Sequence, residues 1–120
     1  MYADKYITSE KKEMFGLFTK KIMNEDAAKA LWTWFEESED WVIECIKKSD
    51  AAFVWAIDER LKPVFPYFKG ELEFQLGYNE GVGEFFFFHF GKKELVRDGE
   101  ILGGMMPASI AERWKFILEA

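Results

Sequence analysis

The chemistry that this sequence could support centres on its single histidine. His89 follows four consecutive phenylalanines, residues 85–88, in the stretch GEFFFFHFGKK. An imidazole acts as a general base when an acidic group orients it, and it otherwise forms a cross-strand pair with a carboxylate. No second histidine and no nucleophile motif accompany His89. An enzyme that uses His89 with an acidic residue is therefore the third of three functions that the sequence suggests.

Strand register decides which residues share a face with His89. The segment ELEFQL (71–76) alternates apolar and acidic residues, and a hairpin joins it to the phenylalanine run. We expect a three-residue loop, residues 79–81, in which Gly81 supplies the positive φ angle. This register pairs Phe74 with Phe86 and places Glu71 opposite His89. Because side chains alternate along a strand, the phenylalanines then divide between two faces.

The two faces differ in chemistry. The first is apolar and is predicted to be the core; it holds Leu72, Phe74, Phe86, Phe88 and Phe90. The second is mixed and predicted to be exposed, and its members are the candidate binding residues; it holds Phe85, Phe87, His89, Glu71, Glu73 and Gln75.

Aromatic anchors inside a polar, acidic rim are typical of protein interfaces. The first hypothesis is therefore a small, acidic, soluble, non-enzymatic protein that acts by protein–protein interaction. Its mixed face would bind a protein partner or a second copy in a homodimer. Inhibitors, antitoxins and immunity proteins share this size and charge. The alternative is a small-molecule binding domain whose aromatic-lined pocket includes Phe53, Trp55 and Tyr67.

The amino-acid composition limits which functions and partners are expected. The formal net charge is −6, which disfavours nucleic acid and anionic membranes as partners. Hydrophobic residues make up 49% of the 120 residues and exclude intrinsic disorder. The lone Cys45 has no partner for a disulfide or a zinc site and is predicted to be a small core residue. No metal or cofactor is predicted.

The sequence carries no targeting or membrane signal. The first residues lack an apolar signal core, and no stretch approaches the roughly 20 apolar residues that a membrane span requires. The cytoplasm is the expected compartment.

The predicted helices and strands, which position the candidate binding residues, indicate one α+β domain spanning 1–120. We expect a helical part over 8–48, a sheet part over 52–103 and a closing helix over 109–119. The sheet would be an antiparallel meander of four to five strands, with the N-terminal and C-terminal helices packed on one face.

Local patterns set these boundaries. Thr8 or Ser9 caps a first helix, and the charged break at residues 38–40 leaves open whether 25–48 is one helix or two. Alternation predicts a strand over 52–58, and Asp98-Gly99 predicts a hairpin. Ser109 and Glu112 stand at capping-box spacing before the closing helix. Trp32 lies off the apolar stripe of its helix, and packing between helices is favoured over an exposed binding role.

Overall fold

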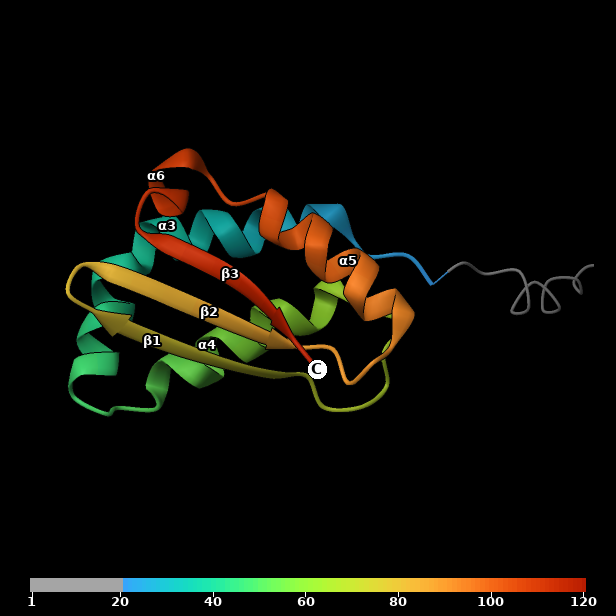
Figure 1. The fold of residues 1–120 in the computed structure, drawn as a ribbon, viewed down its shortest axis with the longest axis horizontal. Helices are drawn as coiled ribbons and strands as arrows, with labels where there is room; N and C mark the ends of the chain where they lie inside the picture. Colours follow the sequence, from blue (N-terminus) through green and yellow to red (C-terminus); the bar gives the residue numbers. More distant parts are fainter. Residues whose placement is uncertain (1–20) are drawn as a thin grey trace, which may run out of the picture.

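The computed structural model describes residues 21–120, which form an α+β arrangement of helices packed on one three-stranded mixed sheet (Figure 1). The helix predicted to begin at Thr8 or Ser9 lies outside the described residues. In chain order the elements are α3 (Glu25–Lys47), α4 (Ala52–Leu61), the 3-10 turn η1 (Lys62–Val64), β1 (Glu73–Asn79), β2 (Val82–Phe88), α5 (Lys93–Gly104), α6 (Ala108–Ala111) and β3 (Trp114–Glu119). Among the helices of residues 21–120, none combines the length and apolar character that crossing a bilayer requires.

Helix α3 is one continuous helix, which answers the question that the sequence left open. Asn24 caps it, because its side chain accepts a hydrogen bond from the Ala27 amide at 3.0 Å. The charged residues at 38–40 do not break it, because Glu39 turns inward and is only 7% exposed. The buried face also includes Trp32, as expected, and Cys45, whose predicted core position is confirmed.

Residues 52–58 form a helix, so the strand predicted there is wrong. In α4, Ile57 and Leu61 are four residues apart and both are buried, with Phe53 half-buried one turn earlier. The apolar residues of 52–58 fit the alternating spacing of a strand and also the three- to four-residue spacing of a helix. The side chains that are fully buried are the ones at helical spacing. Trp55 lies off that stripe and is 74% exposed.

Strands β1 and β2 form the predicted hairpin, but its turn has two residues instead of three. Glu80 and Gly81 both adopt positive φ, 53° and 81°, as a type I′ turn requires. The positive φ predicted at Gly81 is confirmed. Phe74 lies opposite Phe87 rather than Phe86, so the predicted register is off by one residue.

This shift reverses the face assignment of the phenylalanine run. Phe85 and Phe87, predicted to be exposed, are buried at 1% and 0% exposure. Phe86 and Phe88, predicted to be core, are half-buried on the opposite face. Because side chains alternate along a strand, a slip of one residue moves every side chain to the other face.

The chain after β2 also differs from prediction. Asp98 and Gly99 are buried inside α5 and do not form a hairpin. The closing helix over 109–119 is limited to the single turn α6, and the segment that follows is β3. The helical connection makes β3 parallel to β2, so the sheet has three strands in mixed orientation instead of a four- to five-stranded antiparallel meander.

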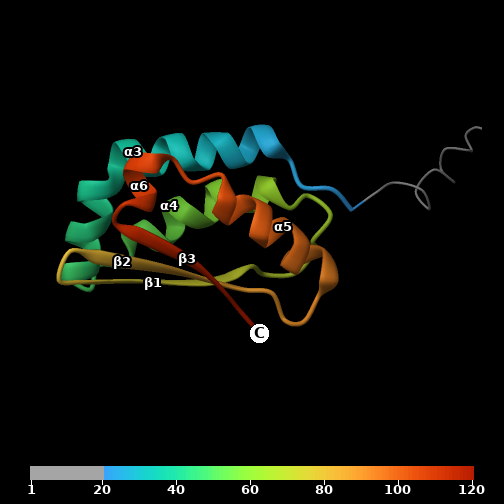
Figure 2. The ribbon, with the colours of Figure 1, turned by 45° about the horizontal axis from the view of Figure 1, so that its top comes forward.

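The helices lie on one side of the sheet (Figure 2). Between the two layers is an aromatic core in which the ring of Phe35 on α3 meets that of Trp114 on β3 at 5.0 Å and 90°. Phe65 stacks on Phe87 at 5.2 Å. Such pairs stabilise a core beyond the area that they bury.

Candidate functional site

The sheet has an open face, which no helix of residues 21–120 covers (Figure 2). Alternation along the three strands and their pairing register define its members. They are Glu73, Gln75, Glu84, Phe86, Phe88, Lys115, Ile117 and Glu119. The two phenylalanines and Ile117 are half-buried among these charged and polar side chains. The mixed face predicted from sequence therefore exists, but with the other pair of phenylalanines.

Two depressions adjoin this face along strand β1. The first, of about 270 Å³, lies between α4 and the residues before and within β1; it is lined by Val54, Trp55, Asp58, Glu71, Leu72, Glu73 and Phe74. The second, of about 290 Å³, lies at the end of the hairpin and is lined by Glu73, Phe74, Gln75, Phe88 and Phe90. Since they share Glu73 and Phe74, we treat them as one surface, the β1 surface.

Phe90 occupies an unfavourable conformation on the β1 surface. Its φ angle is 54°, a left-handed value that is rare for a bulky residue, and Gly91 follows at 71°. The side chain is 49% exposed, so burial does not offset the conformational cost of roughly 1–3 kcal/mol. The turn therefore presents a large aromatic side chain to solvent at an energetic cost.

The β1 surface is acidic. Asp58 forms an ion pair with Lys62 at 3.1 Å. That hydrogen bond raises the pKa of Lys62, and the nearby Glu71 raises it further. Within residues 21–120, Glu71 and Glu73 have no ion-pair partner. Their charges therefore remain available beside Trp55 and Phe90.

The structure brings together only some of the predicted site residues. Glu71, Glu73 and Gln75 lie on the β1 surface. Phe85 and Phe87 are buried in the core, so a partner could reach them only if the protein unfolded. The predicted pairing of Glu71 with His89 is wrong, because the β1–β2 ladder ends at Glu73 opposite Phe88.

His89 lies in the turn after β2 and is half-buried. Its Nδ1 accepts a hydrogen bond from the Gly91 amide at 2.9 Å. This contact is local and holds the turn that carries Phe90.

Sequence reasoning missed Trp55, Phe88 and Phe90 as surface residues. A helical reading of 52–61 would have placed Trp55 off the stripe of Phe53, Ile57 and Leu61 and so exposed it. For Phe88, the missing signal was the length of the turn.

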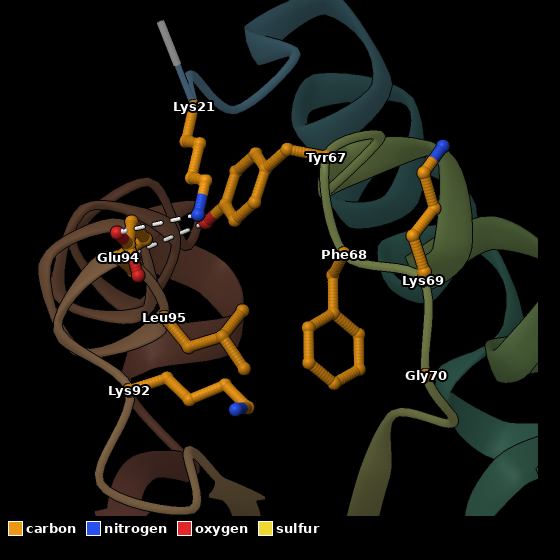
Figure 3. A pocket seen from close by; sticks show the side chains of 8 residues that line it. All are labelled: Lys21, Tyr67, Phe68, Lys69, Gly70, Lys92, Glu94 and Leu95. Atoms are coloured by element: carbon orange, nitrogen blue, oxygen red, sulfur yellow. Dashed lines mark hydrogen bonds and ion pairs between the residues drawn. The ribbon is translucent and has the colours of Figure 1, made fainter.

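A further pocket, of about 370 Å³, lies between the beginning of α5 and the segment before β1 (Figure 3). It is lined by Lys21, Tyr67, Phe68, Lys69, Gly70, Lys92, Glu94 and Leu95. In Figure 3, Lys92 and the ring of Phe68 extend into the pocket, whereas Lys69 points away from it. Lys21 pairs with Glu94 at 3.9 Å. Tyr67 lies here and Trp55 lies on the β1 surface, so the aromatic lining predicted from sequence is divided between two depressions.

A buried carboxylate supports the wall of this pocket. Asp98, 2% exposed, accepts hydrogen bonds from the Tyr67 hydroxyl at 2.6 Å and from Arg97 Nε at 2.8 Å. Burial alone would raise the pKa of Asp98, but the hydrogen bonds from Arg97 and Tyr67 outweigh it, and the pKa is lowered. Burial, together with the same carboxylate, raises the pKa of Tyr67.

Within residues 21–120, no group of three or more histidine, cysteine or acidic side chains converges as a metal site would require. Comparison with protein-family models, with curated proteins and with solved structures gives no match.

Proposed function

We propose that this protein is a non-enzymatic interaction protein that binds a protein partner through the β1 surface. The observation that carries the proposal is the exposure of two aromatic side chains, 74% for Trp55 and 49% for Phe90, beside the acids Glu71 and Glu73. Large aromatic residues dominate binding energy at interfaces, and a polar rim surrounds them.

The charge of the surface specifies the chemistry of its partner. Trp55 and the half-buried Phe74 and Phe88 offer apolar contact, and the carboxylates around them favour cations. We therefore expect a partner segment with apolar side chains flanked by Lys or Arg. A second copy of this chain does not complement the surface, because its own acids would face these acids.

Binding to two series of defined peptides tests the proposal. Both series share the same apolar centres, and one is flanked by Lys and Arg, the other by Asp and Glu. We expect the basic series to bind and the double variant Trp55→Ala, Phe90→Ser to bind it at least tenfold more weakly, since one hot-spot residue is worth about 2 kcal/mol or more. Trp41→Ala removes another exposed tryptophan, 44% exposed on α3, and is the matched control.

The outcomes are distinct. Equal binding of both series, or undiminished binding by the double variant, would contradict the proposal. Circular dichroism checks that each variant is folded, which we expect because both substituted side chains are exposed.

A second candidate function is the binding of a small anionic molecule in the pocket of Figure 3. It is favoured by the position of Lys92, which extends into the pocket beside Phe68 in a protein of net charge −6. A thermal-shift series with small carboxylates and phosphates distinguishes this function from the first. Lys92→Ala should abolish any stabilisation, and Lys69→Ala, whose side chain points away, should not.

A further inference from the structure

Within residues 21–120, the outer edge of β3 presents backbone groups that no other strand pairs with. The strand order β1-β2-β3 places it at the end of the sheet described by residues 21–120. The Arg113 carbonyl accepts a hydrogen bond from the Gly83 amide of β2 at 2.7 Å. The Glu119 carbonyl accepts one at 2.9 Å from the amide of His89, which directly follows β2. Because successive residues of a strand alternate in direction, odd-numbered residues of β3 face β2, while Phe116 and Leu118 direct their N–H and C=O groups outward.

The core is incomplete beside this edge. Phe85 and Phe87 on β2 are fully buried, but their β3 neighbours Phe116 and Leu118 are only half-buried. A groove of about 310 Å³ runs between α5 and β3; it is lined by Gly99, Glu100, Gly103, Gly104, Met106, Phe116 and Leu118. Apolar side chains that are partly exposed next to an open edge invite another strand.

The side chains of β3 are self-complementary about Ile117. On the open face, Lys115 and Glu119 are both exposed and stand two positions before and two positions after Ile117. On the core face, Phe116 and Leu118 stand one position before and after it. An antiparallel copy centred on Ile117 therefore places Lys115 opposite Glu119 twice. A parallel copy in the same register would place each charge opposite its like.

The backbone agrees with this centre. Antiparallel pairing about Ile117 puts Phe116 opposite Leu118 of the second copy, and both residues direct their hydrogen-bonding groups outward. Ile117 then forms a non-hydrogen-bonded pair with its counterpart, in which side chains approach most closely.

From these observations we propose that β3 pairs antiparallel with β3 of a second copy, centred on Ile117, and joins two sheets into one of six strands. The interface is isologous and closed by a two-fold axis. It goes beyond the proposed function, because it occupies the β3 edge, and β1 with its surface lies at the opposite edge of the sheet. The dimer leaves two β1 surfaces free.

Charge exchange on β3 tests the proposal. Sedimentation equilibrium of the full chain should give twice the monomer mass for the wild type. Lys115→Glu and Glu119→Lys each place like charges opposite one another twice, and each should raise the dimer dissociation constant about tenfold or more. The double variant restores both pairs, as does an equimolar mixture of the two single variants, so dimer should return in both samples. Glu73→Lys, the same charge change on β1, should leave the mass unchanged.

Two results would overturn the proposal. The first is a wild-type protein that stays monomeric at about 100 μM, a concentration at which a dimer of micromolar affinity is populated. The second is a dimer that Lys115→Glu and Glu119→Lys leave intact. Circular dichroism verifies that these exposed substitutions preserve the fold. The Lys115→Glu monomer should bind the basic peptides as the wild type does, so failure of either proposal is recognised separately.

Discussion

Arg113, the residue before β3, donates a hydrogen bond from Nε to the carboxylate of Glu39 in the middle of α3, at 2.8 Å. The Trp114 indole N–H donates to the same carboxylate at 2.9 Å. Glu39 is buried and Arg113 is partly exposed, so the pair joins the helical layer to the sheet at the protein surface. The hydrogen bond from Arg113 lowers the pKa of Glu39 and, with that from Trp114, outweighs the effect of burial.

The lowered pKa of Glu39 predicts that acid weakens the fold. Since the folded-state pKa is below the ordinary value of 4.5, the carboxylate stabilises the protein at pH above that value, and this stability is lost as pH falls through the folded-state pKa. We expect Glu39→Gln to lower the free energy of unfolding by about 1–3 kcal/mol at pH 7. Urea unfolding of both proteins from pH 7 to pH 3 should show the difference shrinking with acidification. A difference that stays constant with pH would contradict the assignment.

Tyr67→Phe should destabilise the protein although it removes a single oxygen. The hydroxyl donates to the buried Asp98 carboxylate at 2.6 Å. Arg97 still donates to that carboxylate in the variant, so the loss is one hydrogen bond to a charged group, which contributes about 1.5–3 kcal/mol. Tyr78→Phe is the control, because within residues 21–120 the Tyr78 hydroxyl makes no hydrogen bond to protein; it should change the free energy of unfolding by less than about 0.5 kcal/mol. Equal effects of the two substitutions in denaturant titrations would argue against the Asp98 contact.

Gly83 and Gly77 should respond oppositely to alanine. A Cβ atom at Gly83 would lie 2.3 Å from the Trp114 ring, whereas one at Gly77 would meet nothing within 4 Å. Overpacking costs about 1–3 kcal/mol, so Gly83→Ala should lower the free energy of unfolding by about 1–3 kcal/mol. Gly77→Ala should be neutral or stabilise by up to about 1 kcal/mol, because it restricts the unfolded chain. Thermal unfolding of the two variants makes the comparison, and tolerance of alanine at Gly83 would show that Trp114 does not pack there.

Sequence patterns predicted the parts of this fold that depend on local chemistry. The segment 25–48 was predicted to be helical and contains α3, and Gly81 indicated the hairpin. The alternation from Leu72 to Leu76 predicted the strand that became β1. Each of these signals is contained within a few residues.

The wrong predictions concern features that distant contacts decide. Ser109 with Glu112 fits a capping box, but Trp114 packs against Phe35 and Tyr78, and its segment pairs with β2. Asp98-Gly99 fits a hairpin turn, but Asp98 is satisfied by Tyr67, 31 residues earlier. Pairing with β2 overrides local helical preference, and no pattern within 109–119 reveals it.

The candidate site was partly predicted for the same reason. Glu73 and Gln75 were placed beside phenylalanines on an exposed sheet face, and the structure confirms an open face with both residues on it. The identity of the phenylalanines depended on whether the turn has two residues or three. With Glu at position 80, the sequence lacks the Asn-Gly pair that signals a two-residue turn.

That turn provides the last prediction. Glu80 adopts φ of 53° and is exposed at the tip of the hairpin. Asparagine tolerates left-handed φ better than glutamate and forms the favoured Asn-Gly type I′ turn with Gly81. We expect Glu80→Asn to raise the free energy of unfolding by about 0.5–1 kcal/mol, and Glu80→Val to lower it, because a β-branched residue disfavours positive φ. Denaturant titration of the three proteins measures both changes. If the loop instead had three residues with positive φ at Gly81 alone, valine would be tolerated at position 80, and Phe86 rather than Phe87 would face the core.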